Sequence, residues 1–232
     1  MWTVVMLTSV AIAGFFVVPY AFGSLSSLGK ANVGLASVYA DRPVPIQIAF
    51  YCHITFSGLA LVVGPFQFAR AIRRRKIEMH RLIGRVYVIA VAVGSAAAFV
   101  MSFVSSVAFD GFFGFGSLAV LWGWTTYRGY RAVRNRDFAS HQAWMIRSFA
   151  LTFAAPTLRI WLLALTTAQL LFGHGVSQGQ AFHTAYYAVP FLCWIPNIVV
   201  AELIIRRRNL PGLRFSPSPT SGHQETAPTT SS

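Results

Sequence analysis

Two histidines in similar arginine-rich settings are the residues of this chain best suited to binding chemistry. His80 ends the segment RAIRRRKIEMH (70–80), and His141 ends RAVRNRDFASH (131–141), with no gap between the two copies when they are aligned. Each copy lies between two long apolar stretches, which predicts a duplicated unit of helix, basic loop, histidine and helix. Two such units packed about a pseudo-twofold axis would bring both imidazoles to the same membrane depth.

A pair of imidazoles at equal depth can bind a haem iron from its two faces, if each ring is oriented by a further hydrogen-bond partner. We therefore take His80 and His141 as candidate metal ligands for a haem b cofactor. Three arginines nearby are candidate partners for the haem propionates: Arg81, Arg85 and Arg147. The alternative is that each histidine caps its helix or hydrogen-bonds to its arginine-rich loop.

The space for a flat ligand would come from residues close to the pair in sequence. Gly84 follows His80 by about one helical turn, which predicts room beside the ring. Trp144 and Met145 follow His141 and would wall that space.

A second group of polar residues falls inside apolar stretches: His53, Gln67, Arg159 and Asn197. An arginine within the membrane usually faces a bundle interior, a wet cavity or an anionic partner. At 100° per residue, Ser148, Thr152 and Thr166 share the helix face of Arg159. Small and polar faces also suit plain helix–helix packing, so a structural role stays open for all four.

Two partnerships follow from the same spacing. His53 is expected to be buried against Ser57 of its own helix and against a neighbouring helix. Glu202 is expected to pair with Arg206, four residues on, or with Arg147.

The elements that would position these residues are membrane helices. The 232 residues are 55% hydrophobic and only 11% charged, with a mean hydropathy of +0.57, which excludes an ordinary soluble domain. A hydrocarbon core needs ~20 apolar residues per helix, and lipid favours helices because every backbone amide must be satisfied within the segment. The predicted fold class is an all-α membrane bundle of six transmembrane helices, with helices 2–3 and 4–5 forming the duplicated core. The six spans are 2–22, 44–68, 83–108, 112–130, 145–172 and 184–205.

The strong positive charge sets topology. Of the 19 Lys and Arg residues, 16 lie between 70 and 85, between 128 and 147, or between 206 and 214. Only Lys30 and Arg42 fall in the other loops. This positive-inside bias predicts that both termini and the loops 69–82 and 128–144 are cytoplasmic. It also accounts for the net charge of +13 without a nucleic-acid partner.

The domain organisation is a transmembrane bundle over residues 1–208 followed by a tail. Residues 209–232 are rich in Pro, Ser and Thr, which predicts a disordered cytoplasmic tail. Cys52 and Cys193 both fall within predicted spans and show no disulfide or redox-motif spacing.

The motifs also carry a resemblance. Gly64-Pro65-x-Gln67 after His53, His80-Arg81-x-x-Gly84-Arg85-x-Tyr87, and His141-x-x-Trp144-Met145-x-Arg147-Ser148 resemble a bacterial family of multi-pass membrane proteins catalogued as a domain of unknown function. The resemblance covers about residues 44–165 and implies a bacterial inner (plasma) membrane location, not an activity. A more distant likeness is to transmembrane b-type cytochromes. There the second histidine pair fails, since His53 corresponds to Gly114.

Three functions remain open on this sequence. The first is a non-enzymatic accessory or ligand-binding membrane component, favoured because no carboxylate pair, Ser/His/Asp set or Cys cluster is visible. The second is a haem-binding electron-transfer protein using His80 and His141, with a quinone or a membrane redox partner. The third is a small-solute or proton-coupled transporter built on the intramembrane polar residues. The lipid bilayer is the expected partner in all three, and each is compatible with an oligomer.

Overall fold

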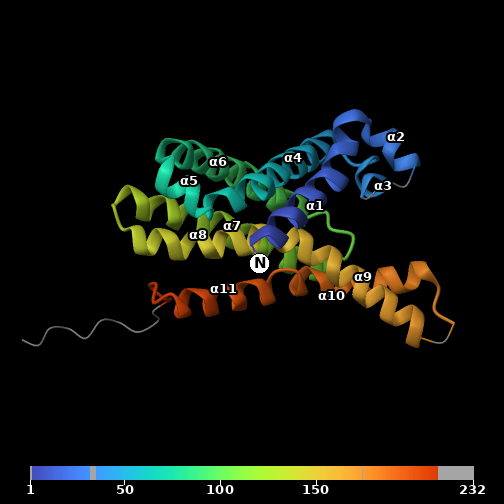
Figure 1. Ribbon diagram of the computed structural model, residues 1–232. Coiled ribbons are helices and arrows are strands. Elements are labelled where there is room, and N and C mark those ends of the chain that lie inside the picture. The colour runs from blue at the N-terminus through green and yellow to red at the C-terminus, as the bar shows by residue number, and fades with distance from the viewer. Residues whose placement is uncertain (1, 32–34, 174, 214–232) are drawn as a thin grey trace, which may run out of the picture.

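The computed structural model describes residues 2–31, 35–173 and 175–213, and within these ranges the chain is entirely helical, with no strand. Figure 1 shows the helices running roughly along one direction, with α5, the α7–α8 junction and the end of α11 at one end and α2, α3 and the α9–α10 junction at the other. We name these the basic end and the far end. The helices are α1 (Trp2–Phe22), α2 (Leu25–Lys30), α3 (Ala36–Tyr39), α4 (Val44–Gln67), α5 (Arg70–Arg75), α6 (Ile77–Ser102), α7 (Ala108–Arg134), α8 (Phe138–Thr152), α9 (Ala154–Phe172), α10 (Gln178–Leu192) and α11 (Ile195–Arg207).

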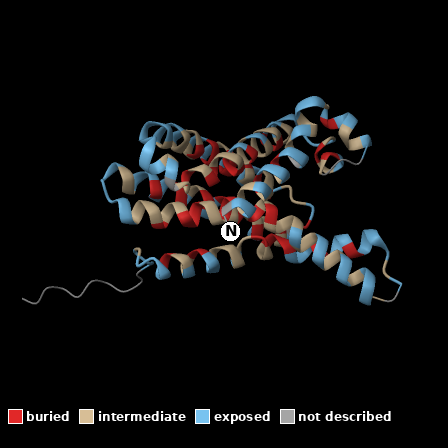
Figure 2. Cartoon of the chain, viewed as in Figure 1, coloured by how far each residue is buried: buried red, intermediate tan, exposed pale blue. Residues whose placement is uncertain are grey.

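The core is a four-helix bundle of α4, α6, α7 and α8. Helix α6 packs against α4 and α7, and α8 packs against α7 and α4, so α6 and α8 lie diagonally across the bundle. Figure 2 shows buried residues concentrated where these helices meet. The central cluster combines small and aromatic side chains, which let helices approach closely and fill the space between them: Ala60, Tyr87, Ala90, Val91, Trp122 and Leu151.

Five segments within the described residues are long and apolar enough to cross a membrane, not the six that we predicted. They are Thr3–Phe22, Val44–Gln67, Ile77–Ser102, Phe138–Phe172 and Gln178–Arg207. The predicted span 112–130 is the one that fails, although α7 is a helix of 27 residues there.

The reason lies in what α7 contacts. It packs against α6, α8 and α10, and apart from Trp122 its buried positions are small or polar, including Gly114, Gly116, Thr125 and Thr126. The outer face of α7 still carries exposed apolar side chains such as Val120 and Leu121. The glycines and threonines of its buried face lower its mean hydropathy, and they let the neighbouring helices approach closely.

The last two candidate spans are each built from two helices. Segment Phe138–Phe172 is interrupted at Phe153, between α8 and α9, and Gln178–Arg207 is interrupted at Cys193 and Trp194, between α10 and α11. Pro156 and Pro196 lie in the first turns after these breaks, where proline is tolerated because its missing N–H has no intrahelical acceptor. Beyond the breaks, α9 and α10 pack against each other.

The two arginine-rich segments are more helical than predicted. The first forms the short helix α5, and the second continues α7 as far as Arg134. Helix α6 consequently starts at Ile77, six residues before the predicted span at 83, and α8 starts at Phe138. Arg136 turns the chain between α7 and α8 with a φ of 60°.

The predicted disordered tail lies largely outside the described residues, which end at 213. Helix α11 ends at Arg207, close to the predicted end of the bundle at 208.

Candidate functional site

His53 lies in the middle of α4 and is held by two partners. Its Nδ1 lies 3.0 Å from the carbonyl oxygen of Gly94 on α6 and 3.1 Å from the hydroxyl of Ser57. The close approach of α4 to α6 depends on glycine, since a Cβ at Gly94 would lie 3.0 Å from the Ser57 hydroxyl oxygen. This confirms the prediction that His53 packs against Ser57 and a neighbouring helix.

Arg159 lies on α9, in the turn after Pro156. Its Nη1 donates a hydrogen bond to the carbonyl oxygen of Ala155 at 2.7 Å. The guanidinium is within electrostatic range of His53 on α4, Tyr20 on α1 and Tyr186 on α10. Arg159 therefore faces the bundle interior, as predicted, with α4 within its range.

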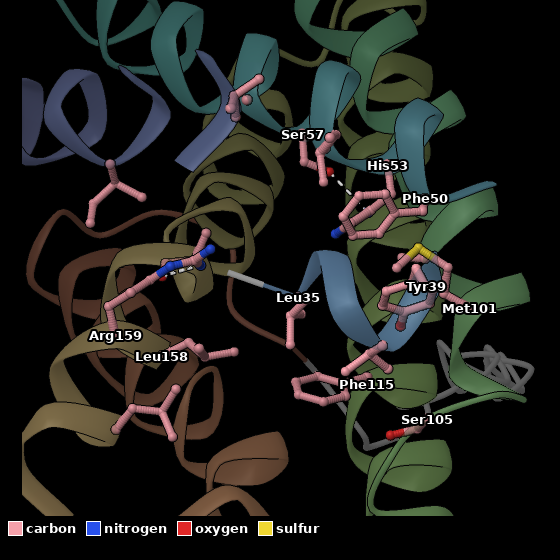
Figure 3. Close-up of a pocket in the computed structure, with 18 of the residues that line it drawn as sticks. Leu35, Tyr39, Phe50, His53, Ser57, Met101, Ser105, Phe115, Leu158 and Arg159 are labelled. Carbon is pink, nitrogen blue, oxygen red and sulfur yellow. Dashed lines mark hydrogen bonds between the residues drawn. The ribbon is translucent and has the colours of Figure 1, made fainter. Parts of the chain in front are cut away.

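His53 and Arg159 line one cavity of about 620 Å³. Figure 3 shows the two side chains on opposite sides of it, with Leu35, Tyr39 and Phe115 around the space between them. The volume falls in the range of small-molecule sites, roughly 300–1,000 Å³. The other polar side chains of its wall are hydroxyl groups: Tyr20, Tyr39, Ser57, Ser102, Ser105, Ser106, Thr152, Thr166 and Tyr186.

The cavity wall is apolar elsewhere, and no Asp or Glu is among the described residues that form it. Its apolar side chains come from α1, α4, α6, α7 and α9, for example Val17, Phe50, Met101, Phe115 and Leu162. The space is thus a mostly apolar chamber with a cation on one side and an imidazole on the other.

A buried hydroxyl network adjoins this cavity and shares Thr152 with it. The Tyr87 hydroxyl lies 2.8 Å from Ser148 Oγ and 2.7 Å from Thr152 Oγ1. Trp122 Nε1 donates to Thr152 Oγ1 at 2.8 Å, and Thr126 lies 2.6 Å from Ser148. Every member is satisfied, so the network ties α6, α7 and α8 together. The residues predicted to share the face of Arg159 therefore have different places: Thr166 lines the cavity, Ser148 belongs to the network, and Thr152 belongs to both.

The histidine pair of the basic end has a different setting. His80 and His141 are each the fourth residue of their helices, α6 and α8, and the two lie within electrostatic range of each other. Nδ1 of His141 lies 2.9 Å from the carbonyl oxygen of Gly129. Nδ1 of His80 is buried and has no hydrogen-bond partner within the described residues.

The space predicted beside Gly84 is filled. A Cβ at Gly84 would lie 3.3 Å from Oε1 of Gln67, and one at Gly129 would lie 2.8 Å from Sδ of Met145. The prediction that Gly84 leaves room for a flat ligand is therefore wrong, because the side chain of Gln67 from α4 occupies that position. Gln67 itself is buried, and its Nε2 has no partner among the described residues.

The arginines proposed as propionate partners differ in their surroundings. Arg81 and Arg85 are exposed on α6. Arg147 is buried and binds Glu202 of α11 through two hydrogen bonds of 2.5 and 3.0 Å. The predicted partnership of Glu202 with Arg147 is thereby confirmed.

Asn197 has a structural setting. Its Nδ2 donates to Thr157 Oγ1 and to the carbonyl oxygens of Ala150 and Cys193, at 3.0 to 3.1 Å. These bonds satisfy carbonyl groups at both helix breaks. No group of three or more His, Cys, Asp or Glu in the described ranges is placed to hold a metal ion.

Sequence reasoning found His53 and Arg159 but not the partners that complete the cavity. Tyr20 and Tyr186 come from α1 and α10, and their spacing carries no signal that links them to α4. The wall residues that the shared helix faces did indicate are Ser57, beside His53, and Thr152 and Thr166, beside Arg159.

Five segments long and apolar enough to cross a membrane identify this chain as a membrane protein. It belongs to the family described as "Predicted membrane protein (DUF2306)", whose profile matches residues 50–205. The match runs from α4 into α11 and confirms the resemblance drawn from the motifs. No curated protein and no solved structure matches the chain.

Proposed function

We propose that this protein binds a small lipid-soluble molecule in the cavity between His53 and Arg159. The observation that carries the proposal is a cavity of about 620 Å³ with a mainly apolar wall. Among the described residues that line it, Arg159 is the only one with a charged side chain. Ligand sites combine such apolar walls with a few well-placed polar groups. Placing an arginine within a membrane-spanning segment costs free energy. A ligand that accepts hydrogen bonds from Arg159 would offset that cost.

The proposal can be tested by filling the cavity. Ala98 on α6 lines it, whereas Ala96 on the same helix is exposed and does not. Native mass spectrometry of the detergent-purified protein should detect a co-purifying lipid-soluble molecule in the unaltered chain and in Ala96→Phe. Ala98→Phe should lose it. Equal retention by both variants would place the ligand elsewhere, and no bound molecule in any sample, together with no binding of added lipophiles, would refute the function.

A second candidate is haem binding by His80 and His141, and one observation favours it. These histidines sit on helices that lie diagonally across the bundle, and the hydrogen bond from His141 Nδ1 to Gly129 leaves its Nε2 available. Gln67 and Met145 fill the space beside Gly84 and Gly129, so haem fits only if both side chains rotate away. Absorption spectra before and after dithionite decide this: a Soret band lost in His80→Ala and His141→Ala supports it, and a colourless protein ends it.

We further infer that α7 crosses the bilayer beside the five apolar spans, and that the basic end faces the cytoplasm of a bacterial inner membrane. Helix α6 leaves the basic end and α8 starts from it again, so α7 must return along the bundle. This arrangement brings both termini to the cytoplasmic side. The equivalent positions of His80 and His141 in α6 and α8 support the duplication of the helix pair.

A further inference from the structure

The hydrogen bond from His53 fixes which of its ring nitrogens can bind a ligand. The partner of Nδ1 is the Gly94 carbonyl oxygen at 3.0 Å, and a carbonyl oxygen only accepts hydrogen bonds. The proton of the neutral ring is therefore assigned to Nδ1. Nε2 then carries a lone pair and can only accept.

That acceptor is not used within the protein. Nε2 of His53 has no hydrogen-bond partner among the described residues, and the side chain forms part of the cavity wall. Arg159 on the opposite side offers only donors. Thr166, also on the wall, has a buried hydroxyl with no partner in the described part of the chain.

The two sides of the cavity thus require different things of a ligand. His53 Nε2 accepts a hydrogen bond from a hydroxyl group, and Arg159 donates to an oxygen that accepts. Between them the wall carries aromatic rings, including Tyr39, Phe50 and Phe115, which suit a flat apolar body.

We propose that the ligand is a lipid-soluble hydroquinone, a phenolic ring with one hydroxyl donating to His53 Nε2 and the opposite oxygen accepting from Arg159. This rests on the proposed function and deepens it. A long-chain carboxylate satisfies Arg159 but offers His53 no proton. An oxidised quinone has only acceptor oxygens, so it leaves Nε2 unpaired in a buried site.

A matched ligand series separates these chemistries. The full chain in detergent is titrated anaerobically with nonyl-hydroquinone, nonyl-benzoquinone, the dimethyl ether of the hydroquinone, and decanoate, with tryptophan fluorescence as the readout. The hydroquinone should bind at least about tenfold tighter than the quinone or the ether, since an unmade hydrogen bond in a buried site costs roughly that much.

Two variants locate the preference. His53→Phe should bind hydroquinone and ether equally, because the acceptor is gone while the cavity remains. His183→Phe is the matched control and should keep the preference, since His183 is exposed on α10 and does not line the cavity.

The outcomes keep the two proposals apart. Equal binding of hydroquinone, quinone and ether by the unaltered chain overturns the hydroquinone assignment but leaves the cavity a ligand site. Tighter binding of decanoate overturns it as well. Failure of every probe to bind, with no co-purifying ligand, refutes the proposed function itself. The ligand series on the unaltered chain decides the question even if His53→Phe does not fold.

Discussion

The ion pair between Arg147 and Glu202 joins α8 to α11 inside the protein. Only 3% of the Arg147 side chain is exposed, against 23% for Glu202. Burying two charges is costly, and the cost is offset only while both partners are present. The guanidinium of Arg147 also lies over the ring of Trp144, 4.6 Å from its centroid.

We expect Glu202→Leu to destabilise the protein by about 3–5 kcal/mol, because it leaves Arg147 buried without its carboxylate. Adding Arg147→Met should recover much of that loss, since two apolar side chains of similar volume replace the pair. Thermal unfolding in detergent measures both. If the two losses simply add, the pair has no special coupling and this account is wrong.

The hydroxyl of Tyr87 joins two residues of α8 across the bundle. Tyr87→Phe removes both hydrogen bonds and leaves the ring in place, so we expect a loss of about 1–2 kcal/mol. Tyr130→Phe is the matched control, because Tyr130 is exposed on α7; it should leave stability unchanged. Equal effects of the two substitutions, measured by thermal unfolding, would contradict the structural role of the network.

At the scale of single elements, α8 depends on a capping residue. Asp137 precedes the helix, and its Oδ1 accepts a hydrogen bond from the Ser140 amide at 2.9 Å. Hydrogen bonds from Ser140 hold the pKa of the Asp137 carboxyl below its ordinary value. A carboxyl with a lowered folded-state pKa contributes stability above its unfolded pKa and loses it as the pH falls through the folded value.

Asp137→Ala should therefore lower the melting temperature at pH 7 and have little effect at about pH 2, where the carboxyl is protonated in both states. Thermal unfolding across that pH range gives the measurement. Asp41→Ala serves as the control, since Asp41 is exposed in the loop before α4. A difference between variant and unaltered chain that stays constant with pH would show that the cap acts by other means.

Element positions were largely predictable, because apolar length and Arg/Lys clusters determine where membrane helices lie. Helix α4 matches its predicted span within one residue. The sequence could not predict the true start of α6, since Glu78, His80 and Arg81 resemble loop residues but continue the helix into the basic end. The breaks near Phe153 and Cys193 lie close to Pro156 and Pro196, but their form depends on tertiary contacts such as those of Asn197.

The candidate site was predictable only in part. His53 and Arg159 are unusual enough within apolar stretches to be singled out by type alone. Their meeting in one cavity depends on how α1, α9 and α10 pack around α4, and no local pattern encodes that packing. The same limit explains Gly84, where a side chain from another helix fills the space that the local sequence left open.

At the scale of the whole molecule, the distribution of charge predicts its orientation. In a background with Cys52 and Cys193 replaced by alanine, Ser37→Cys should react with a membrane-impermeant maleimide in intact cells. Asn135→Cys should react only after lysis. Both positions are exposed, at the far end and the basic end respectively. The reverse pattern would invert the topology.

The modest hydropathy of α7 has a consequence for how the protein is made. A segment with arginines near one end and glycines along its faces partitions poorly into lipid by itself. We expect it to enter the bilayer only together with α6 and α8, which offer partners for its polar faces. A nascent chain released before α8 is synthesised would leave α7 in water, exposed to cellular proteases. Insertion of α7 would then be completed only when Thr126 and Trp122 form their hydrogen bonds with Ser148 and Thr152 of α8.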